Sequence, residues 1–71
     1  MRELDWLILR KLYEKRSISK AAEDLYVTQS ALTKRVKTIE QEWGVEVVKR
    51  SNQGVTFTED GRYLVKKAGI M

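Results

Sequence analysis

A set of polar side chains between positions 29 and 37 combines hydrogen-bonding groups with positive charge. The set comprises Gln29, Ser30, Thr33, Lys34 and Lys37. Glutamine, serine and threonine side chains can pair with the edges of nucleic-acid bases, whereas lysine and arginine bind phosphates or guanine. Any solvated helix face is polar, but such faces usually include acids, and this stretch has none before Glu40. The residue types therefore predict an interface for a nucleic acid.

A single helix must hold these side chains for their spacing to matter. At about 100° per residue, the set falls on one side of a helix that begins after the capping residue Thr28, with Gln29 projecting past the helix end to join it. An apolar stripe on the other side is predicted to face the core. That stripe comprises Leu32, Val36, Ile39 and Trp43.

The positive charge of the chain is concentrated around the same helix. The net charge is +4, yet residues 25–39 hold three basic residues and no acid, and residues 47–58 hold two more and again no acid. The remaining 44 residues hold nine basic and ten acidic residues. Chance clustering on a solvated surface is the plain alternative. The placement favours a polyanion-binding surface.

Composition excludes several classes of function. The chain has no cysteine and no histidine, which removes disulfides, thiolate metal sites, the usual general base and the commonest metal ligand. Glu40 and Glu42 lie about 200° apart on a helix, so they do not form a paired-acid site. No apolar run approaches the roughly 20 residues of a membrane span, and the N-terminus is not that of a signal peptide. We expect a soluble, intracellular protein that is neither an enzyme nor a cofactor or metal binder.

Capping and turn residues divide the 71-residue chain into one small domain of four helices and a hairpin. Gly44 is placed to end the third helix in the left-handed conformation, and the run 51–54 has the composition of a turn. The predicted elements are a helix at 4–15, a short helix from Ser17 through Leu25, a helix from Thr28 to Trp43, strands at 45–50 and 55–57, and a last helix that begins after Thr58 and is still running at Met71.

The second and third helices, with the short break between them, predict a helix-turn-helix. Ala21 and Ala22 are small and allow two helices to cross closely, and Leu25 and Val27 can pack at the crossing. Tyr26 is the odd member of the turn, because many such turns have glycine there. If the turn needs a positive φ, tyrosine is costly at this position.

The run from Ser17 to Gly61 resembles the N-terminal DNA-binding domain of LysR-type bacterial transcription regulators, and the match covers essentially the whole chain. The matching residues are Ser17, Ala21, Ala22, Leu25, the run 27–31, Thr33, Ile39, Glu40, Gly44, Arg50 and the "TFTEDG" segment at 56–61. The resemblance implies a mainly α winged helix-turn-helix, with a three-helix core, a two-stranded wing and a C-terminal linker helix. It also implies a cytoplasmic bacterial protein with a DNA-binding domain at 1–57 and the start of a linker helix at 58–71.

In such a domain the third helix enters the major groove of double-stranded DNA and the wing contacts the backbone or minor groove. Gln29, Ser30, Thr33 and Lys34 match the residues that read the groove, and Arg50 matches an arginine at the base of the wing. The full predicted DNA-binding set is Thr28, Gln29, Ser30, Thr33, Lys34, Arg35, Lys37, Lys49, Arg50, Asn52 and Gln53. A protein-interaction module on the same scaffold is the alternative, and it would expose apolar residues on the groove helix.

Three features depart from the family pattern. Many members have proline at the position of Ser30, and the wing often carries an arginine near Gln53 that reaches the minor groove, where this chain has Asn52 and Gln53. Members are also several-fold longer, so the 71 residues are expected to be an excised domain without a small-molecule site.

The first helix predicts a homodimer on a near-palindromic DNA site. It is apolar on two sides, and a helix of this kind needs two burial partners. The predicted dimer contacts are Leu4, Leu7 and Ile8 with Leu64, Val65, Ala68 and Met71. The alternative is that the last helix folds back onto the first helix of the same chain. The resemblance favours linker helices that pair two subunits.

Overall fold

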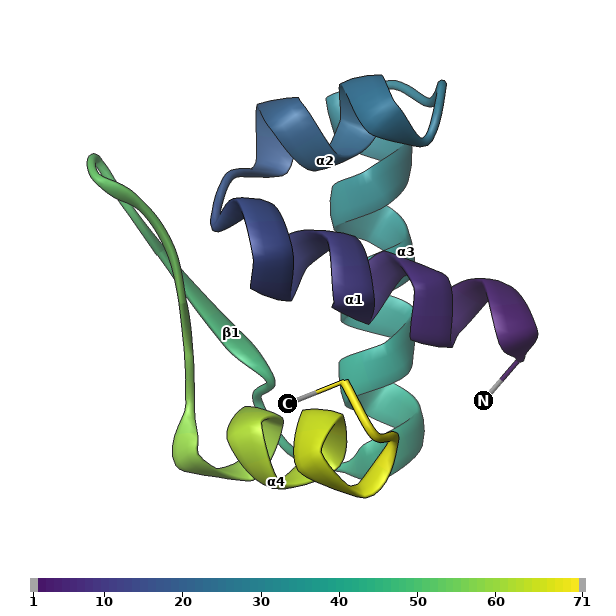
Figure 1. Cartoon of the computed structure of the whole chain (residues 1–71), viewed down its shortest axis with the longest axis vertical. Coiled ribbons are helices and arrows are strands. Elements are labelled where there is room, and N and C mark those ends of the chain that lie inside the picture. The colour runs from purple at the N-terminus through teal and green to yellow at the C-terminus, as the bar shows by residue number, and fades with distance from the viewer. Residues whose placement is uncertain (1, 71) are drawn as a thin grey trace.

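The computed structural model describes residues 2–70, which form four helices and one hairpin in the order of the sequence (Figure 1). This arrangement confirms the predicted winged helix-turn-helix. The elements are α1 (Glu3–Lys15), α2 (Ile18–Asp24), α3 (Gln29–Trp43), β1 (Val48–Ser51), β2 (Gly54–Phe57) and α4 (Glu59–Lys67).

Side-chain caps fix the starts of the later helices where the sequence predicts them. The hydroxyl of Ser17 accepts the Lys20 amide at the start of α2, and that of Thr28 accepts the Ala31 amide at the start of α3. Each hydroxyl satisfies an amide that has no partner within its helix. Gly44 ends α3 with φ 69°, as predicted.

The turn between α2 and α3 places Tyr26 in the left-handed region, with φ 57°. The Val27 amide donates to the Ala22 carbonyl at 3.0 Å and the Tyr26 amide to the Glu23 carbonyl at 3.1 Å. This pair of bonds is a Schellman motif, which requires a left-handed residue at the position of Tyr26. The predicted cost of tyrosine here is therefore present in the fold.

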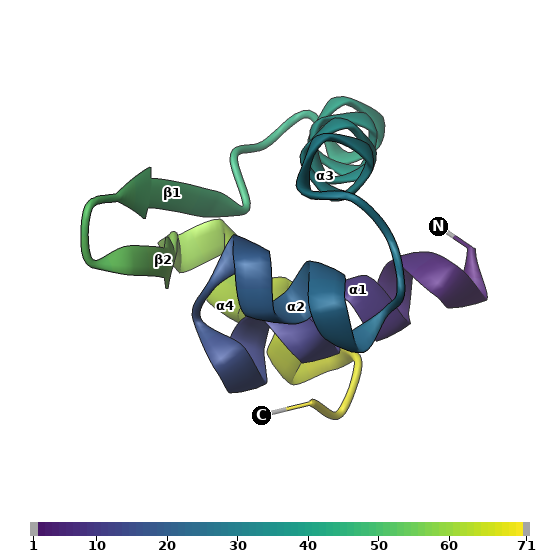
Figure 2. The same cartoon turned by 90° about the horizontal axis from the view of Figure 1, so that it is seen from above.

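The core lies where α1, α2 and α3 cross, with α4 and the hairpin closing one side (Figure 2). Of the stripe predicted on α3, Leu32, Val36 and Ile39 are buried. Trp43 is not: it is 45% exposed and packs edge to face on Trp6, with ring centroids 6.5 Å apart. The prediction of a core position for Trp43 was wrong: it is the last residue of α3, and its ring packs on the partly buried Trp6 at the edge of the core.

The hairpin is held against the domain by backbone contacts. Val48 pairs with Phe57 and Ser51 with Gly54 in an antiparallel register. The Val55 amide donates to the Arg16 carbonyl at 2.9 Å, and a Cβ at position 54 would collide with that same carbonyl. The first strand begins at residue 48, later than predicted, because residues 45–47 connect α3 to the sheet.

Helix α4 folds back onto α1 of its own chain (Figure 1). This is the alternative to the predicted contact between α4 and a second subunit. Ile8, Leu64 and Val65, which were predicted to contact a second subunit, are instead buried in the chain's own core. In this conformation they cannot serve as dimer contacts. Leu4 and Leu7 remain 53% and 43% exposed.

The predicted extension of the last helix to Met71 does not occur within the described residues. Helix α4 ends at Lys67, Gly69 has φ 74°, and the Ile70 amide donates to the Val65 carbonyl at 2.9 Å. Ala68, a predicted dimer contact, is partly buried at this helix end, while Met71 lies outside the described residues. In the part of the chain that the structure describes, no helix is both long enough and apolar enough to cross a membrane.

Candidate nucleic-acid interface

The polar side of α3 is free of the core and faces a hollow between this helix and the hairpin. Most of the predicted residues on it are exposed, and Thr33 is half-buried. One hollow in this region is lined by Gln29, Ser30, Thr33, Lys34, Lys37 and Arg50. The structure thus brings together the α3 residues that the sequence singled out, and adds to them the side chain of Arg50 from β1.

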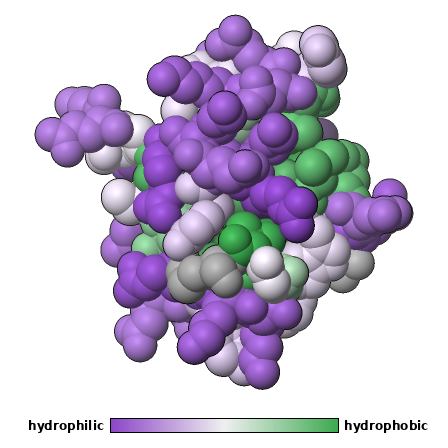
Figure 3. All heavy atoms as spheres, in the orientation of Figure 1, coloured by the Kyte–Doolittle hydropathy of each residue, from purple (hydrophilic) through white to green (hydrophobic). Residues whose placement is uncertain are grey.

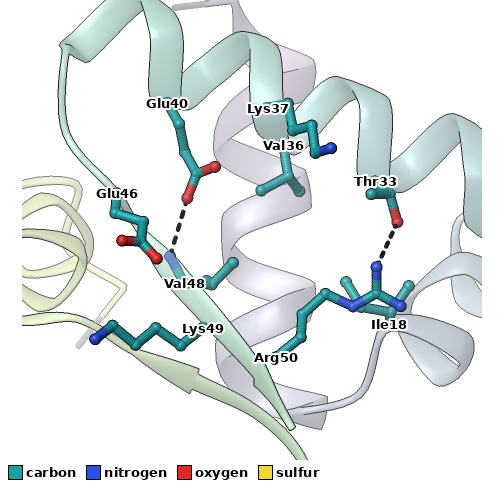
Figure 4. Close-up of a pocket in the computed structure, with 9 residues that line it drawn as sticks. All are labelled: Ile18, Thr33, Val36, Lys37, Glu40, Glu46, Val48, Lys49 and Arg50. Atoms are coloured by element: carbon teal, nitrogen blue, oxygen red, sulfur yellow. Dashed lines mark hydrogen bonds between the residues drawn. The ribbon is translucent and has the colours of Figure 1, made fainter.

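Arg50 connects the helix to the wing. Its guanidinium nitrogen lies 3.5 Å from the Thr33 hydroxyl oxygen, and Figure 4 shows the side chain reaching from β1 toward α3. Arg50 also lines the two neighbouring hollows, one running along β1 and one beside the wing tip. The three hollows share the Arg50 side chain, and we call them together the α3–wing groove.

A carboxylate fixes the width of this groove at its far end. Glu40 on α3 accepts the amides of Val47 and Val48 at 2.7 and 3.3 Å (Figure 4). Because these amides begin the first strand, the single side chain ties the last part of α3 to the wing. The carboxylate thus connects the two elements that border the groove.

The remaining wing residues lie around this groove. Lys49 lines it although its side chain points away from Arg50, as expected for successive residues of a strand (Figure 4). Asn52 lines the hollow beside the wing tip, and Gln53 is exposed in the two-residue turn. Thr28, at the start of α3, is exposed but serves as the helix cap.

Arg35 is the one predicted DNA-binding residue that the structure places elsewhere. Its side chain turns to α1, where it donates to both carboxylate oxygens of Asp5, at 2.6 and 3.0 Å. It lines an apolar hollow with Leu4 and Val27, and not the α3–wing groove. Because its position on the helix is about 100° from Lys34, the side chain points at a buried acid, and the structure does not bring it to the α3–wing groove.

Electrostatics in the Asp5–Arg35 pair favour the ionised form of both groups. Burial raises the pKa of Asp5, but hydrogen bonds from Arg35 and from the Arg2 amide lower the pKa by more, so the net shift is downward. The hydrogen bond to Asp5 raises the pKa of Arg35 above its usual value. The pair is thus a charged contact between α1 and α3.

Sequence reasoning missed several residues of the groove. Ser17, Ile18 and Ser19, at the start of α2, line it beside Arg50, and Glu46 lines it near Lys49. No local signal marks them, because their approach to the wing depends on how α1 and α2 pack. Among residues 2–70 no cluster of acidic side chains could hold a metal ion. Apart from the carboxylates of Glu40 and Glu46, the groove offers cationic and hydrogen-bonding groups, which suits an extended polyanion.

Comparison with known proteins gives the family. Residues 5–62 match the model of the bacterial regulatory helix-turn-helix proteins of the lysR family. The chain belongs to this family, as the sequence predicted. It is 41% identical over all of its 71 residues to the uncharacterized HTH-type transcriptional regulator YraN of Bacillus subtilis, of which it covers 25%. The chain thus spans about a quarter of the length of the curated relatives it matches.

Solved structures show the same fold. The crystal structure of a CbnR_DBD–DNA complex superimposes with a TM-score of 0.90 at 25% identity, over 97% of this chain and 79% of that one. The BenM_DBD/catB site 1 DNA complex gives a TM-score of 0.88 at 25% identity, over 96% of this chain and 76% of the other. Both of these similar domains were crystallised with DNA.

Proposed function

We propose that this domain binds double-stranded DNA sequence-specifically as part of a transcription regulator. Helix α3 lies in the major groove and the wing, residues 45–57, contacts the backbone or the minor groove. The observation that carries the proposal is the α3–wing groove: Arg50 makes the polar side of α3 continuous with the wing. The domains of the same fold in complexes with DNA support it.

The side chains divide into reading and positioning groups. Gln29 and Thr33 read base edges, since an amide and a hydroxyl offer directional hydrogen bonds. Lys34, Lys37 and Arg50 contact phosphates or guanine, and phosphate contacts set orientation without carrying base information. The supporting contacts of Ser30, Thr28, Lys49, Asn52 and Gln53 remain predictions.

The competing role, a protein-interaction module, calls for exposed apolar side chains on the groove side of α3. That side carries glutamine, serine, threonine and lysine instead. Figure 3 shows hydrophobic atoms exposed among polar ones on the face where α1 lies, away from the groove side of α3. The relatives are transcriptional regulators, which points away from catalysis. We infer a non-enzymatic regulator that acts on the chromosome in the bacterial cytoplasm.

We further propose that the working protein is a homodimer on a near-palindromic site. Residues 1–57 bind DNA and residues 58–71 begin the connection to the rest of the protein. Leu4 and Leu7 are the predicted contacts that stay exposed, so they are the candidates for pairing. Sedimentation of the domain on a duplex with two half-sites tests this. Two proteins per duplex are expected, and a single protein at saturation would reject the dimer.

Selection of bound sequences from a random DNA pool tests the main proposal. The wild-type domain should enrich one motif, to be used as the operator. Gln29→Ala should weaken operator binding by about 1–3 kcal/mol and spare random DNA, whereas Arg50→Ala should weaken both. Gln41→Ala is the matched control, because Gln41 is exposed on the same helix but lines a different hollow. Equal losses of Gln29→Ala on both DNAs would refute its reading role.

A further inference from the structure

We propose that Asp5 is a positioning residue for DNA recognition. It fixes the direction of α3 through Arg35 and, by neutralising that arginine, limits binding to random DNA. The inference rests on the proposed DNA-binding function and adds a determinant of selectivity outside the α3–wing groove.

The geometry of the pair is that of a rigid clamp. Two nitrogens of the planar guanidinium, Nε and Nη2, donate to the two oxygens of one carboxylate, at 2.6 and 3.0 Å, and such a two-point contact fixes orientation as well as distance. Asp5 is fully buried, and Arg35 is 27% exposed. The Asp5 carboxylate is itself held by the Arg2 amide at 3.0 Å, which closes the first turn of α1.

A second contact between the same helices lies close by. Trp6 follows Asp5 on α1, and its ring meets Trp43 edge to face with an interplanar angle of 70°. Arg35 and Trp43 are eight residues apart, or about 12 Å along α3. The first turn of α1 therefore holds α3 at two separated points, which determines the direction of the helix and not only its distance.

The direction of α3 matters because base readout is geometric. Gln29 and Thr33 lie about one helical turn apart, and their contacts with base edges must form together. Phosphate contacts from long lysine side chains tolerate a tilt far better. A loosened clamp should thus reduce operator binding more than binding to random DNA.

The charge of the pair acts in the same sense. An unpaired arginine on the recognition helix would add a cation that attracts any DNA sequence. Asp5 occupies the Nε–Nη2 edge of this arginine and neutralises its charge. Removal of the acid therefore frees a cation while it loosens the helix, and both changes lower the ratio of operator to random-DNA affinity.

The test compares four proteins on the selected operator and on a random duplex at one salt concentration: wild type, Asp5→Asn, Arg35→Lys and the double variant. Arg35→Lys keeps the positive charge but loses the planar two-point contact. We expect each single variant to lower the operator-to-random ratio by about tenfold, the size of one lost base contact. The double variant should lower it little further, because both changes break the same clamp.

Asp24→Asn is the matched control for charge. Asp24 pairs with Lys11 and Lys15 at 3.7 and 3.5 Å, between α1 and α2, so its loss changes the net charge equally without touching α3. This control should keep the wild-type ratio. Circular dichroism confirms that each variant is folded, and a folded but merely destabilised protein would weaken on both DNAs alike. If Asp5→Asn does not fold, Arg35→Lys and Asp24→Asn decide the matter.

Three results would overturn the inference. Tighter operator binding by Asp5→Asn would mean that the freed arginine serves as a DNA contact. Additive losses in the double variant would mean that the residues act separately, and unchanged ratios would mean that the clamp does not affect reading. A wild-type domain that prefers no sequence is a different failure, because it refutes the proposed function itself.

Discussion

Lys34 and Arg35 are adjacent cations on the same helix, yet the structure uses them in opposite ways. Lys34 is exposed and lines the α3–wing groove, whereas Arg35 turns to α1 and pairs with a buried carboxylate. Neither the residue type nor the local charge distinguishes them. The role of a charged residue is therefore determined by the residues that the fold places opposite its face of the helix.

The same contrast extends to the two sides of α3. The packed side carries Leu32, Val36 and Ile39 in the core, whereas the groove side makes few contacts with the rest of the chain. This side is linked to the wing by a long hydrogen bond between Arg50 and Thr33, at 3.5 Å, and farther along the helix by the two bonds that Glu40 accepts from Val47 and Val48. A side that contributes little to folding is free to be occupied by a ligand.

The largest expected effect is on the free energy of unfolding, and it distinguishes Leu32 on the packed side of α3 from Thr33 on the groove side. Leu32→Ala should lower the free energy of unfolding by about 2–5 kcal/mol, because Leu32 is 1% exposed and its truncation leaves a cavity. Thr33→Ala should change it by no more than about 0.5 kcal/mol. Urea titration followed by circular dichroism measures both. A large loss for Thr33→Ala would show that the groove side supports the fold.

The dependence of stability on pH tests the contribution of the Asp5–Arg35 pair. Because the pKa of Asp5 is lowered in the folded state, the pair contributes stability above the ordinary aspartate pKa of about 3.9. That contribution is lost as the pH falls through the lower, folded-state pKa. Thermal melts from pH 6 to pH 2 should show a steeper loss of Tm for the wild type than for Asp5→Asn. Equal slopes would show that the pair contributes nothing to acid sensitivity.

The fold and most of the groove could be predicted from the sequence because their signals are local. Capping residues mark the starts of α2, α3 and α4, and the polar set falls on one face of α3. Helix α3 ends at Gly44, and the turn before α3 passes through Tyr26; both residues have the left-handed backbone conformation. These features depend on residues within one helical turn of each other.

What the sequence missed at Arg35 and Trp43 concerns contacts between distant segments, whereas the start of β1 and the end of α4 were misplaced locally. Arg35 meets Asp5 across thirty residues, and nothing near Arg35 announces the acid. A signal existed at the other end: Asp5 shares a helix stripe with Leu9 and Leu12, and an acid on a buried stripe needs a cation. The sequence left open whether α4 packs on α1 of its own chain or on a second subunit, because an apolar stripe does not determine which surface covers it.

The dependence of DNA affinity on salt concentration tests whether Lys34, and not Arg35, contacts phosphate. With Arg35 paired, four cations remain at the groove, namely Lys34, Lys37, Lys49 and Arg50, so the log–log slope of affinity against salt should be near −3.6 per subunit, from about −0.9 per phosphate contact. Lys34→Ala should make the slope shallower by about 0.9, and Arg35→Lys should leave it unchanged. A slope near zero would refute DNA binding, and an equal change for Arg35→Lys would return Arg35 to the interface.

The smallest expected effect concerns Tyr26, which precedes α3 and belongs to neither of its sides. Its side chain is 95% exposed, while its backbone has φ 57°. A non-glycine residue in this conformation costs about 1–2 kcal/mol, and a glycine gives back roughly 0.5–1 kcal/mol through the greater entropy of the unfolded chain.

Tyr26→Gly should therefore raise the free energy of unfolding by about 0.5–1 kcal/mol, measured by urea titration with an unchanged dependence on denaturant. Tyr26→Ala is the control: it removes the exposed ring but keeps the Cβ, so its stability should stay close to that of the wild type. Operator affinity should not change in either variant, since the turn leaves the α3–wing groove intact. A loss of stability in both variants would show that the exposed ring packs on the domain, and a loss of affinity in both would extend the interface to the turn.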